Sequence, residues 1–303
     1  MSLSSLINII EEDKEPLDGS VPENVMRSSE YESPAFNLEG ILYKNLSQGS
    51  RERISKDGFV HISSLNKICP RQYALALKHD VDIVSAVYPS TTVMWGLGRA
   101  IEVIVRDGLI SYFGRDKIYA DWRCSCRETS TFGLHEEKVC PSCNTSVDVY
   151  NEAVFYDRKN GIKGSPDLLY IHNGVLNIVE IKSVKGTGAK SFESYRDCGE
   201  ETSNAYLFQV ASYYYLLGVN GLKVNPIASI LFCNKEFEMA APIYNMVIDA
   251  RDHYDTVLQA REVGKEVLDF VTEGTLPEKT CDDIMCRSAK ACPLAIYCFA
   301  ERT

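Results

Sequence analysis

Residues 164–182 read GSPDLLYIHNGVLNIVEIK, with a turn signal between two apolar runs. Asn173 and Gly174 both tolerate a positive φ, which favours a two-residue hairpin turn between strands. That turn pairs His172 with Val175. Counting outward from this pair places Asp167 directly opposite Glu180. Lys182 follows two residues after Glu180, so the pattern predicts it on the same face of the sheet.

Two carboxylates directly opposite each other on a sheet repel and destabilise the strand pair. A divalent cation between Asp167 and Glu180 would offset this repulsion, because Mg²⁺ is commonly held by one or two carboxylates. Lys182 would then lie close enough to act on a water molecule or on charge that develops at a phosphate. The alternative is a hairpin on the surface whose Asp, Glu and Lys side chains are simply solvated.

Ser165-Pro166-Asp167 and Glu180-Ile181-Lys182 together resemble the motif of the PD-(D/E)XK nuclease superfamily. The resemblance implies that Asp167, Glu180 and the backbone carbonyl of Ile181 hold Mg²⁺ or Mn²⁺. It also implies an α/β fold with a restriction-endonuclease-like core, in which helices flank a mixed central sheet.

Two further patterns are similar to the RecB-like branch of that superfamily. Gln209 and Tyr213 are spaced i and i+4, so a helix would place them on one face. The resemblance implies that they position nucleic acid beside the metal. Gly98 and Glu102 match an element in which the branch usually carries Gly-x-x-x-His. Because glutamate also binds Mg²⁺ or Mn²⁺, Glu102 becomes a candidate third metal ligand, the alternative being an exposed helix residue.

Cysteines at the two ends of the chain resemble those of iron–sulfur members of the RecB-like branch. Cys69 precedes Pro70 and Arg71, and four cysteines follow late in the chain: Cys281, Cys286, Cys292 and Cys298. The resemblance implies a [4Fe-4S] cluster on Cys69, Cys292, Cys298 and either Cys281 or Cys286, since such clusters usually take four thiolates. It would staple the N-terminal helical lobe to the last segment. A zinc ion on the four late cysteines is the alternative.

A separate group of cysteines forms two close pairs. The pairs are Cys124 with Cys126, and Cys140 with Cys143. Two such pairs are typical of a four-thiolate zinc site, which would fold a small inserted knuckle that has no core of its own. Its role would be structural, or it would contact DNA through basic residues around it. Of the two remaining cysteines, Cys198 and Cys233, we expect small buried side chains rather than ligands.

Composition sets the outer limits of this interpretation. The chain has 303 residues, eleven cysteines and a formal net charge of −10. The acidic balance argues against a general nucleic-acid coat, which would be basic. No apolar run approaches the ~20 residues of a membrane helix, and no signal peptide is apparent. We therefore expect no membrane association and a cytoplasmic location in a bacterial, archaeal or phage-infected cell.

These patterns predict five parts of the chain. They are a loosely ordered arm (1–50), a helical lobe (51–121), a zinc-binding insert (122–147), the nuclease core (148–250) and a C-terminal helix with the iron–sulfur segment (251–303).

The predicted activity is hydrolysis of DNA phosphodiester bonds, by exonuclease action on ends or single strands, in recombination, repair or phage DNA processing. Recombination or replication proteins are expected as partners, and homo-oligomerisation is left open. The main alternative is a non-cleaving DNA-binding scaffold. A redox protein is disfavoured because no dinucleotide-binding glycine motif is present.

Overall fold

The computed structural model describes residues 50–52, 57–65, 69–81, 83–85, 89–187, 191–198, 204–236 and 242–301. All described residues belong to one compact unit, which lies within residues 43–303. Apart from Ser50, the arm predicted for residues 1–50 lies outside the described residues.

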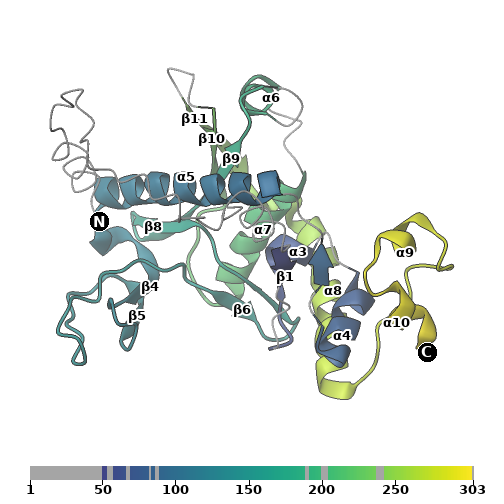
Figure 1. Cartoon of the computed structure of the whole chain (residues 1–303). Helices are drawn as coiled ribbons and strands as arrows, with labels where there is room; N and C mark the ends of the chain where they lie inside the picture. Colours follow the sequence, from purple (N-terminus) through teal and green to yellow (C-terminus); the bar gives the residue numbers. More distant parts are fainter. Residues whose placement is uncertain are drawn as a thin grey trace, which may run out of the picture. The chain divides into compact units, whose positions relative to one another are not determined.

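The central sheet has four strands in the order β11-β10-β9-β8 (Figure 1). They are β8 (Leu168–His172), β9 (Val175–Val184), β10 (Ile227–Asn234) and β11 (Ile243–Asp249). β9 and β10 run parallel, whereas β8–β9 and β10–β11 are antiparallel. The sheet is therefore mixed and flanked by helices, which confirms the predicted α/β class.

The β8–β9 hairpin has the predicted register. Asn173 and Gly174 form its turn with φ values of 50° and 73°, the positive values that a tight hairpin of this kind requires. His172 pairs with Val175, and the ladder ends where Leu168 pairs with Val179. Asp167 is the next residue beyond that end, so the hairpin places it at the edge where β9 continues toward Lys182 paired with β10 but no longer with β8.

Successive residues of β9 point to opposite faces of the sheet. Ile178 packs in a core cluster with buried residues of helix α7 (Asn204–Val219). Val179 and Ile181 pack in a second cluster with residues of helix α5 (Pro89–Phe113). Because side chains alternate along a strand, Glu180 and Lys182 share the α7 face with Ile178.

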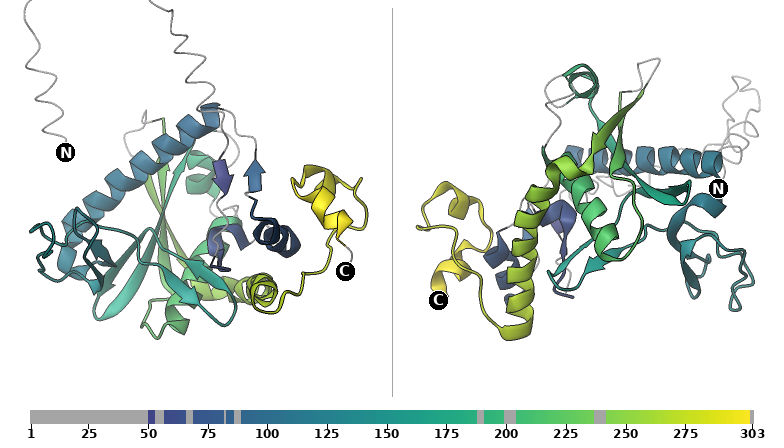
Figure 2. Two further views of the ribbon diagram at one scale, coloured as in Figure 1. Left: turned by 60° about the horizontal axis from the view of Figure 1, so that its bottom comes forward. Right: turned by 180° about the vertical axis from the view of Figure 1, so that it is seen from behind.

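The remaining elements surround this core (Figures 1 and 2). A three-stranded sheet contains β2 (Val60–His61), β7 (Ile162–Gly164) and β6 (Phe155–Asp157), and two-stranded sheets pair β1 (Ser50–Glu52) with β3 (Ile83–Ser85) and β4 (Tyr119–Arg123) with β5 (Ser130–Leu134). Further helices are α3 (Ile62–Leu65), α4 (Pro70–His79), η1 (Arg115–Lys117), α6 (Phe192–Cys198), η2 (Ala250–His253), α8 (Tyr254–Glu273), α9 (Arg287–Ala291) and α10 (Ala295–Ala300). None of the described helices combines the length and apolar character that a membrane crossing needs.

The C-terminal segment folds back onto α4. α10 packs against α4, and Leu294 joins Leu75 and Ala76 in a small apolar cluster. Arg71 is fully buried beneath it, where its Nη1 donates to the carbonyl oxygen of Pro277 at 2.6 Å. These contacts attach residues near position 70 to residues more than two hundred positions later.

A glycine contact joins α8 to the turn between β6 and β7. A Cβ atom added at Gly264 would lie 2.5 Å from the carbonyl oxygen of Asn160 and closer still to a methyl group of Ile162. We expect Gly264→Ala to destabilise the protein by about 1–3 kcal/mol, although alanine normally favours a helix by about 1 kcal/mol. Urea unfolding measures this difference.

Gly218 supplies the matched control, because a Cβ atom there meets nothing within 4 Å near the end of α7. Gly218→Ala should leave stability unchanged or raise it. If the Gly264 and Gly218 variants unfold at the same urea concentration, close packing of α8 on the turn does not limit stability.

Candidate active site

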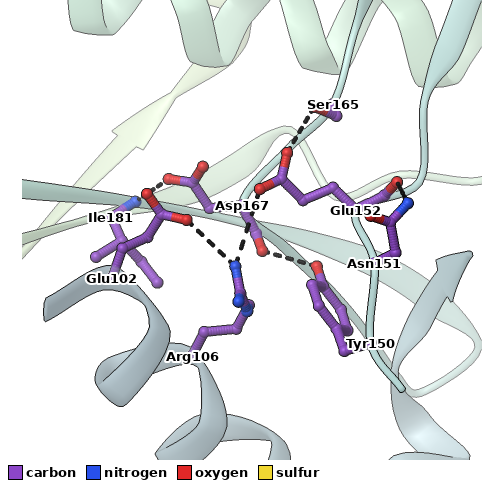
Figure 3. Close-up of polar contacts among 8 residues, drawn as sticks. All are labelled: Glu102, Arg106, Tyr150, Asn151, Glu152, Ser165, Asp167 and Ile181. Atoms are coloured by element: carbon purple, nitrogen blue, oxygen red, sulfur yellow. Dashed lines mark hydrogen bonds and ion pairs between the residues drawn. The ribbon is translucent and has the colours of Figure 1, made fainter. Parts of the chain in front are cut away.

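Asp167 is fixed at the end of β8 by two backbone contacts. Its Oδ2 accepts a hydrogen bond from the backbone N–H of Ile181 at 2.6 Å. Its own carbonyl oxygen accepts from the Tyr150 hydroxyl at 2.7 Å (Figure 3). The carboxylate is therefore held against β9 rather than swinging freely in solvent.

The same contact orients the carbonyl group of Ile181. In an extended strand, the N–H and C=O of one residue point to the same side. Because the Ile181 N–H points to Asp167, its carbonyl oxygen points to that side too. The β8 ladder has already ended at Leu168, so this carbonyl and the Asp167 carboxylate face the same space.

Glu180 is completely buried and only half of its carboxylate is paired. Its Oε1 accepts from the Lys182 ammonium in an ion pair. Its Oε2 is buried and has no hydrogen-bond partner among the described residues. A buried, unpaired carboxylate oxygen is costly unless a proton or a cation compensates it. The Lys182 ammonium also lies 5.6 Å from the centre of the Tyr206 ring, a cation–π contact.

Burial and neighbouring charges shift the pKa values of Glu180, Asp167 and Lys182 in the absence of a cation. Burial, followed by the charge of Asp167, raises the pKa of Glu180 well above its usual value, and burial also raises the pKa of Asp167. Burial disfavours charged Lys182, but the Glu180 and Asp167 carboxylates outweigh it and raise the pKa of Lys182. Lys182 is therefore a cation here, which fits charge stabilisation better than proton abstraction.

A third side of the site comes from α5 and from the loop before β6. Ligand oxygens of Glu102, Glu152 and Asp167 lie within 4.8 Å of one another. Arg106 lies between the two glutamates, with its Nη1 at 3.2 Å from Glu102 and 3.8 Å from Glu152 (Figure 3). Ser165 donates to the second oxygen of Glu152 at 2.7 Å.

Sequence reasoning predicted Glu102 as a residue of the site but missed Glu152. Gly98, four residues before Glu102, allows the close approach of α5, since a Cβ atom there would lie 2.8 Å from the Ser183 hydroxyl on β9. Glu152 belongs to no recognisable motif. It reaches the site because Asn151 attaches its loop to β4, donating to Asp121 at 3.1 Å, and no sequence pattern reports that contact.

Gln209 and Tyr213 lie together on α7, as their spacing predicted. The Gln209 amide donates to the Tyr213 hydroxyl at 2.7 Å. Tyr213 is only 1 % exposed, and burial, then the charges of Glu180 and Asp167, raise its pKa well above the usual value. Tyr213 is thus buried close to Glu180 and Asp167, whereas Gln209 is partly exposed to solvent.

The raised pKa values predict how stability depends on pH when no cation is present. Burial, then the charges of Asp167 and Glu152, raises the pKa of Glu102 to about 7. Between about pH 4.5 and 7 the folded protein therefore holds a proton on Glu102 that the unfolded chain has lost. Stability should fall as pH rises through this window and then level off.

Urea unfolding in EDTA at pH 5 and pH 7.5 measures this effect, with Glu102→Gln beside the wild type. The variant should lose less stability between the two pH values. Equal losses would show that Glu102 titrates normally, contrary to its surroundings of burial and like charge.

The four cysteines of the predicted insert converge. The thiol sulfurs of Cys124, Cys126, Cys140 and Cys143 lie within 4.8 Å of one another, with Cys124–Cys126 at 3.3 Å and Cys126–Cys140 at 3.7 Å. Zn–S bonds of about 2.3 Å in a tetrahedron separate sulfurs by about 3.8 Å. The group therefore has the dimensions of a four-thiolate metal site.

The local backbone explains why these thiols meet. Each close pair is followed by a residue with positive φ, Arg127 at 65° and Asn144 at 54°, so the chain turns back sharply at both places. Thr129 donates its hydroxyl to Cys140 at 3.2 Å. The Thr145 hydroxyl is the main cause that lowers the pKa of Cys143 to about 5. Thiolate, the form that binds metals, is thereby favoured at Cys143.

The five terminal cysteines also gather in one region. Cys69 lies beside the tail, its Sγ 3.4 Å from the Thr280 hydroxyl. Burial raises the pKa of Cys281, with further effects from Cys286 and Cys69. Burial likewise raises the pKa of Cys292, and the charges of Cys69 and Cys298 raise it further. Residues from both ends of the chain thus share one electrostatic environment. Of the two leftover cysteines, Cys233 is buried in the core as expected, and the Cys198 side chain lies outside the described residues.

No protein-family model matches the chain, and no curated protein matches it. Solved structures do match. A protein designated SSO0001 has 14% identity and a TM-score of 0.39, with 88% of this chain and 98% of that chain covered. The alkaline exonuclease LHK-Exo from Laribacter hongkongensis has 12% identity and a TM-score of 0.39, covering 78% and 97%. LHK-Exo in complex with dAMP has 12% identity and a TM-score of 0.37, covering 73% and 96%.

Proposed function

We propose that this protein is a metal-dependent DNA nuclease of the PD-(D/E)XK type, with Asp167, Glu180 and Lys182 at its active site. The buried and unpaired Oε2 of Glu180 carries this proposal, because a bound cation would compensate both this oxygen and the neighbouring, partly buried carboxylate of Asp167. The carbonyl of Ile181 supplies a further oxygen ligand. This all-oxygen donor set suits Mg²⁺ or Mn²⁺.

The chain's own residues fix the geometry for hydrolysis. Asp167 is held by Ile181 and Tyr150, so its carboxylate has a defined direction. Lys182 carries a positive charge beside both carboxylates and is placed to stabilise negative charge that develops on a phosphate. Gln209 offers its amide to the strand while Tyr213 holds that amide in place. A divalent cation, when bound, supplies Lewis-acid charge and lowers the pKa of water.

Two further metal centres belong to the proposal. The four-cysteine group takes Zn²⁺, which stabilises the insert. The terminal cysteines take a [4Fe-4S] cluster through Cys69, Cys292, Cys298 and either Cys281 or Cys286. Iron, acid-labile sulfide and zinc determined on anaerobically purified protein test both assignments. Zinc in place of iron at the terminal cysteines would contradict the second.

Hydrolysis of DNA tests the proposed activity. End-labelled single strands, blunt duplexes and closed circles are incubated with Mg²⁺, Mn²⁺ or EDTA. We expect cation-dependent release of label from linear DNA and none in EDTA, with closed circles resistant because exonuclease action needs an end. The position of the released label then gives strand polarity. Binding of DNA without cleavage under every condition would instead support the scaffold function.

A further inference from the structure

An exposed tryptophan lies on the side of α5 that leads to the candidate active site. Trp95, Gly98, Glu102 and Arg106 follow one another at spacings of three and four residues, which places them along one side of the helix. Glu102 and Arg106 project from that side toward Asp167 (Figure 3). Trp95 lies two turns before Glu102 and is 43 % exposed. A large aromatic ring is therefore open to solvent beside the site.

Two lysines lie next to each other at the ends of neighbouring strands. Asn234, the last residue of β10, pairs with Val184, the last residue of β9. Lys185 and Lys235 are the next residues along the two strands. The Lys235 backbone N–H donates to the Val184 carbonyl oxygen at 2.9 Å, which holds the two segments together. The Lys235 ammonium donates to the carbonyl oxygen of Met94 at 3.4 Å, so it lies against the turn of α5 that carries the tryptophan.

The charges of these two lysines are not compensated by the described part of the protein. Burial, then the charge of Lys185, lowers the pKa of Lys235. Neither ammonium forms an ion pair with a described carboxylate, although the chain as a whole has a net charge of −10. Like charges at close range repel, and an anion beside them would offset that repulsion. This corner of the molecule therefore favours an anionic ligand.

A lysine pair beside an open aromatic ring suits single-stranded DNA. Proteins that hold single strands neutralise the phosphates with basic side chains and stack the bases on aromatic rings. In a duplex the bases are already paired and stacked, so only an unpaired base can lie flat on Trp95. An anion without a base would use the lysines but leave the tryptophan exposed.

We propose that Trp95, Lys185 and Lys235 form a single-strand track, in which a base stacks on Trp95 and the two lysines bind the adjoining phosphates. The strand then runs along α5 to the cation site at Asp167. The inference rests on the proposed nuclease function and names its substrate, an unpaired strand of DNA. None of the three residues belongs to the nuclease motif.

Tryptophan fluorescence in EDTA tests the track without cleavage. The chain has two tryptophans, and Trp122 is fully buried, so quenching by added oligothymidylate reports on Trp95. We expect saturable quenching by the single strand and weaker binding of a blunt duplex. Trp95→Phe should bind within about threefold of the wild type but without quenching, because phenylalanine still stacks. Trp95→Ala should weaken single-strand binding by about 5- to 150-fold, as for the loss of one stacked base.

The dependence of binding on salt tests the lysines. Lys185→Gln and Lys235→Gln should each reduce the slope of the logarithm of the binding constant against the logarithm of salt concentration by about 0.7, the value for one phosphate contact with a single strand. Lys265→Gln is the matched control, since Lys265 is exposed on α8 and carries the same charge, and it should leave the slope unchanged. Thermal unfolding checks that each variant folds. Lys185 is exposed, so its variant keeps the test valid if Lys235→Gln does not fold.

Several results would overturn the track. They are binding of oligothymidylate without quenching, equal weakening of single-strand and duplex binding in Trp95→Ala, and an unchanged salt slope in both lysine variants. Quenching that grows with protein concentration before DNA is added would also overturn it, because a second copy would then cover Trp95. Cleavage of single strands by a wild type that shows no quenching would refute the track alone. Quenching without cleavage in any cation would refute only the proposed activity.

Discussion

Asp167→Asn is expected to lower the rate of DNA hydrolysis by about 10³-fold or more. The substitution keeps the size of the side chain but removes a charge that would hold the proposed divalent cation. Loss of several kcal/mol of transition-state stabilisation corresponds to this factor. Because the asparagine oxygen can still accept from the Ile181 N–H, the fold should be retained. Single-turnover cleavage of end-labelled DNA in Mn²⁺ measures the rate.

Asp107→Asn is the control for this prediction. Asp107 is exposed on α5, next to Arg106 in the sequence. Its replacement by asparagine removes the same charge without changing a residue of the site. Its rate should stay within about twofold of the wild type, as expected for an exposed position. Equal rates for the wild type and the Asp167 variant would remove Asp167 from the mechanism.

Cys140→Ser is expected to abolish zinc binding and to unfold the insert. Cys140 is fully buried, its N–H donates to the carbonyl of Thr145 and its sulfur accepts from Thr129. Small metal sites of this kind supply much of the folding free energy of the loops that they join. Zinc should fall from about one ion per chain to none at the four-thiolate site. Elemental analysis measures the zinc, and limited proteolysis should then cut between residues 124 and 146.

Cys233→Ala separates loss of a ligand from loss of a buried thiol. Cys233 is buried in the core next to β9 and outside the insert, so its replacement should leave zinc content and the protease pattern unchanged. Full zinc content in Cys140→Ser would show that the four thiols do not form the metal site.

The hairpin was predictable because its information is local. Asn173 and Gly174 determine the turn, the turn determines the register, and the register brings Asp167 to Glu180. The two close cysteine pairs are equally local, since each pair meets across one sharp turn. Strand β11 was not predicted, because Ile243–Asp249 lies at the edge of the sheet and pairs only with β10. Only one of its seven side chains is buried, so the segment lacks the regular alternation of buried and exposed residues that marks a strand.

The parts of the site that sequence reasoning missed depend on long-range packing. Glu152 enters because Asn151 bonds to Asp121 on β4, a contact across thirty residues with no periodic signal. The spacing of Gln209 and Tyr213 predicted a shared helix face, but not that α7 would bury Tyr213 against Glu180. The charge on Lys182 likewise depends on burial and on two carboxylates, which only the folded structure brings together.

Hydrolysis in ¹⁸O-labelled water tests the central claim most directly. The protein is incubated with linear DNA and Mn²⁺ in H₂¹⁸O, and the masses of the products are measured by mass spectrometry. If the Asp167–Glu180 site directs water onto the phosphodiester, each new terminal phosphate should carry one ¹⁸O atom, and EDTA should prevent its appearance. Intact DNA in the presence of Mn²⁺, or cleavage products without ¹⁸O, would contradict the account.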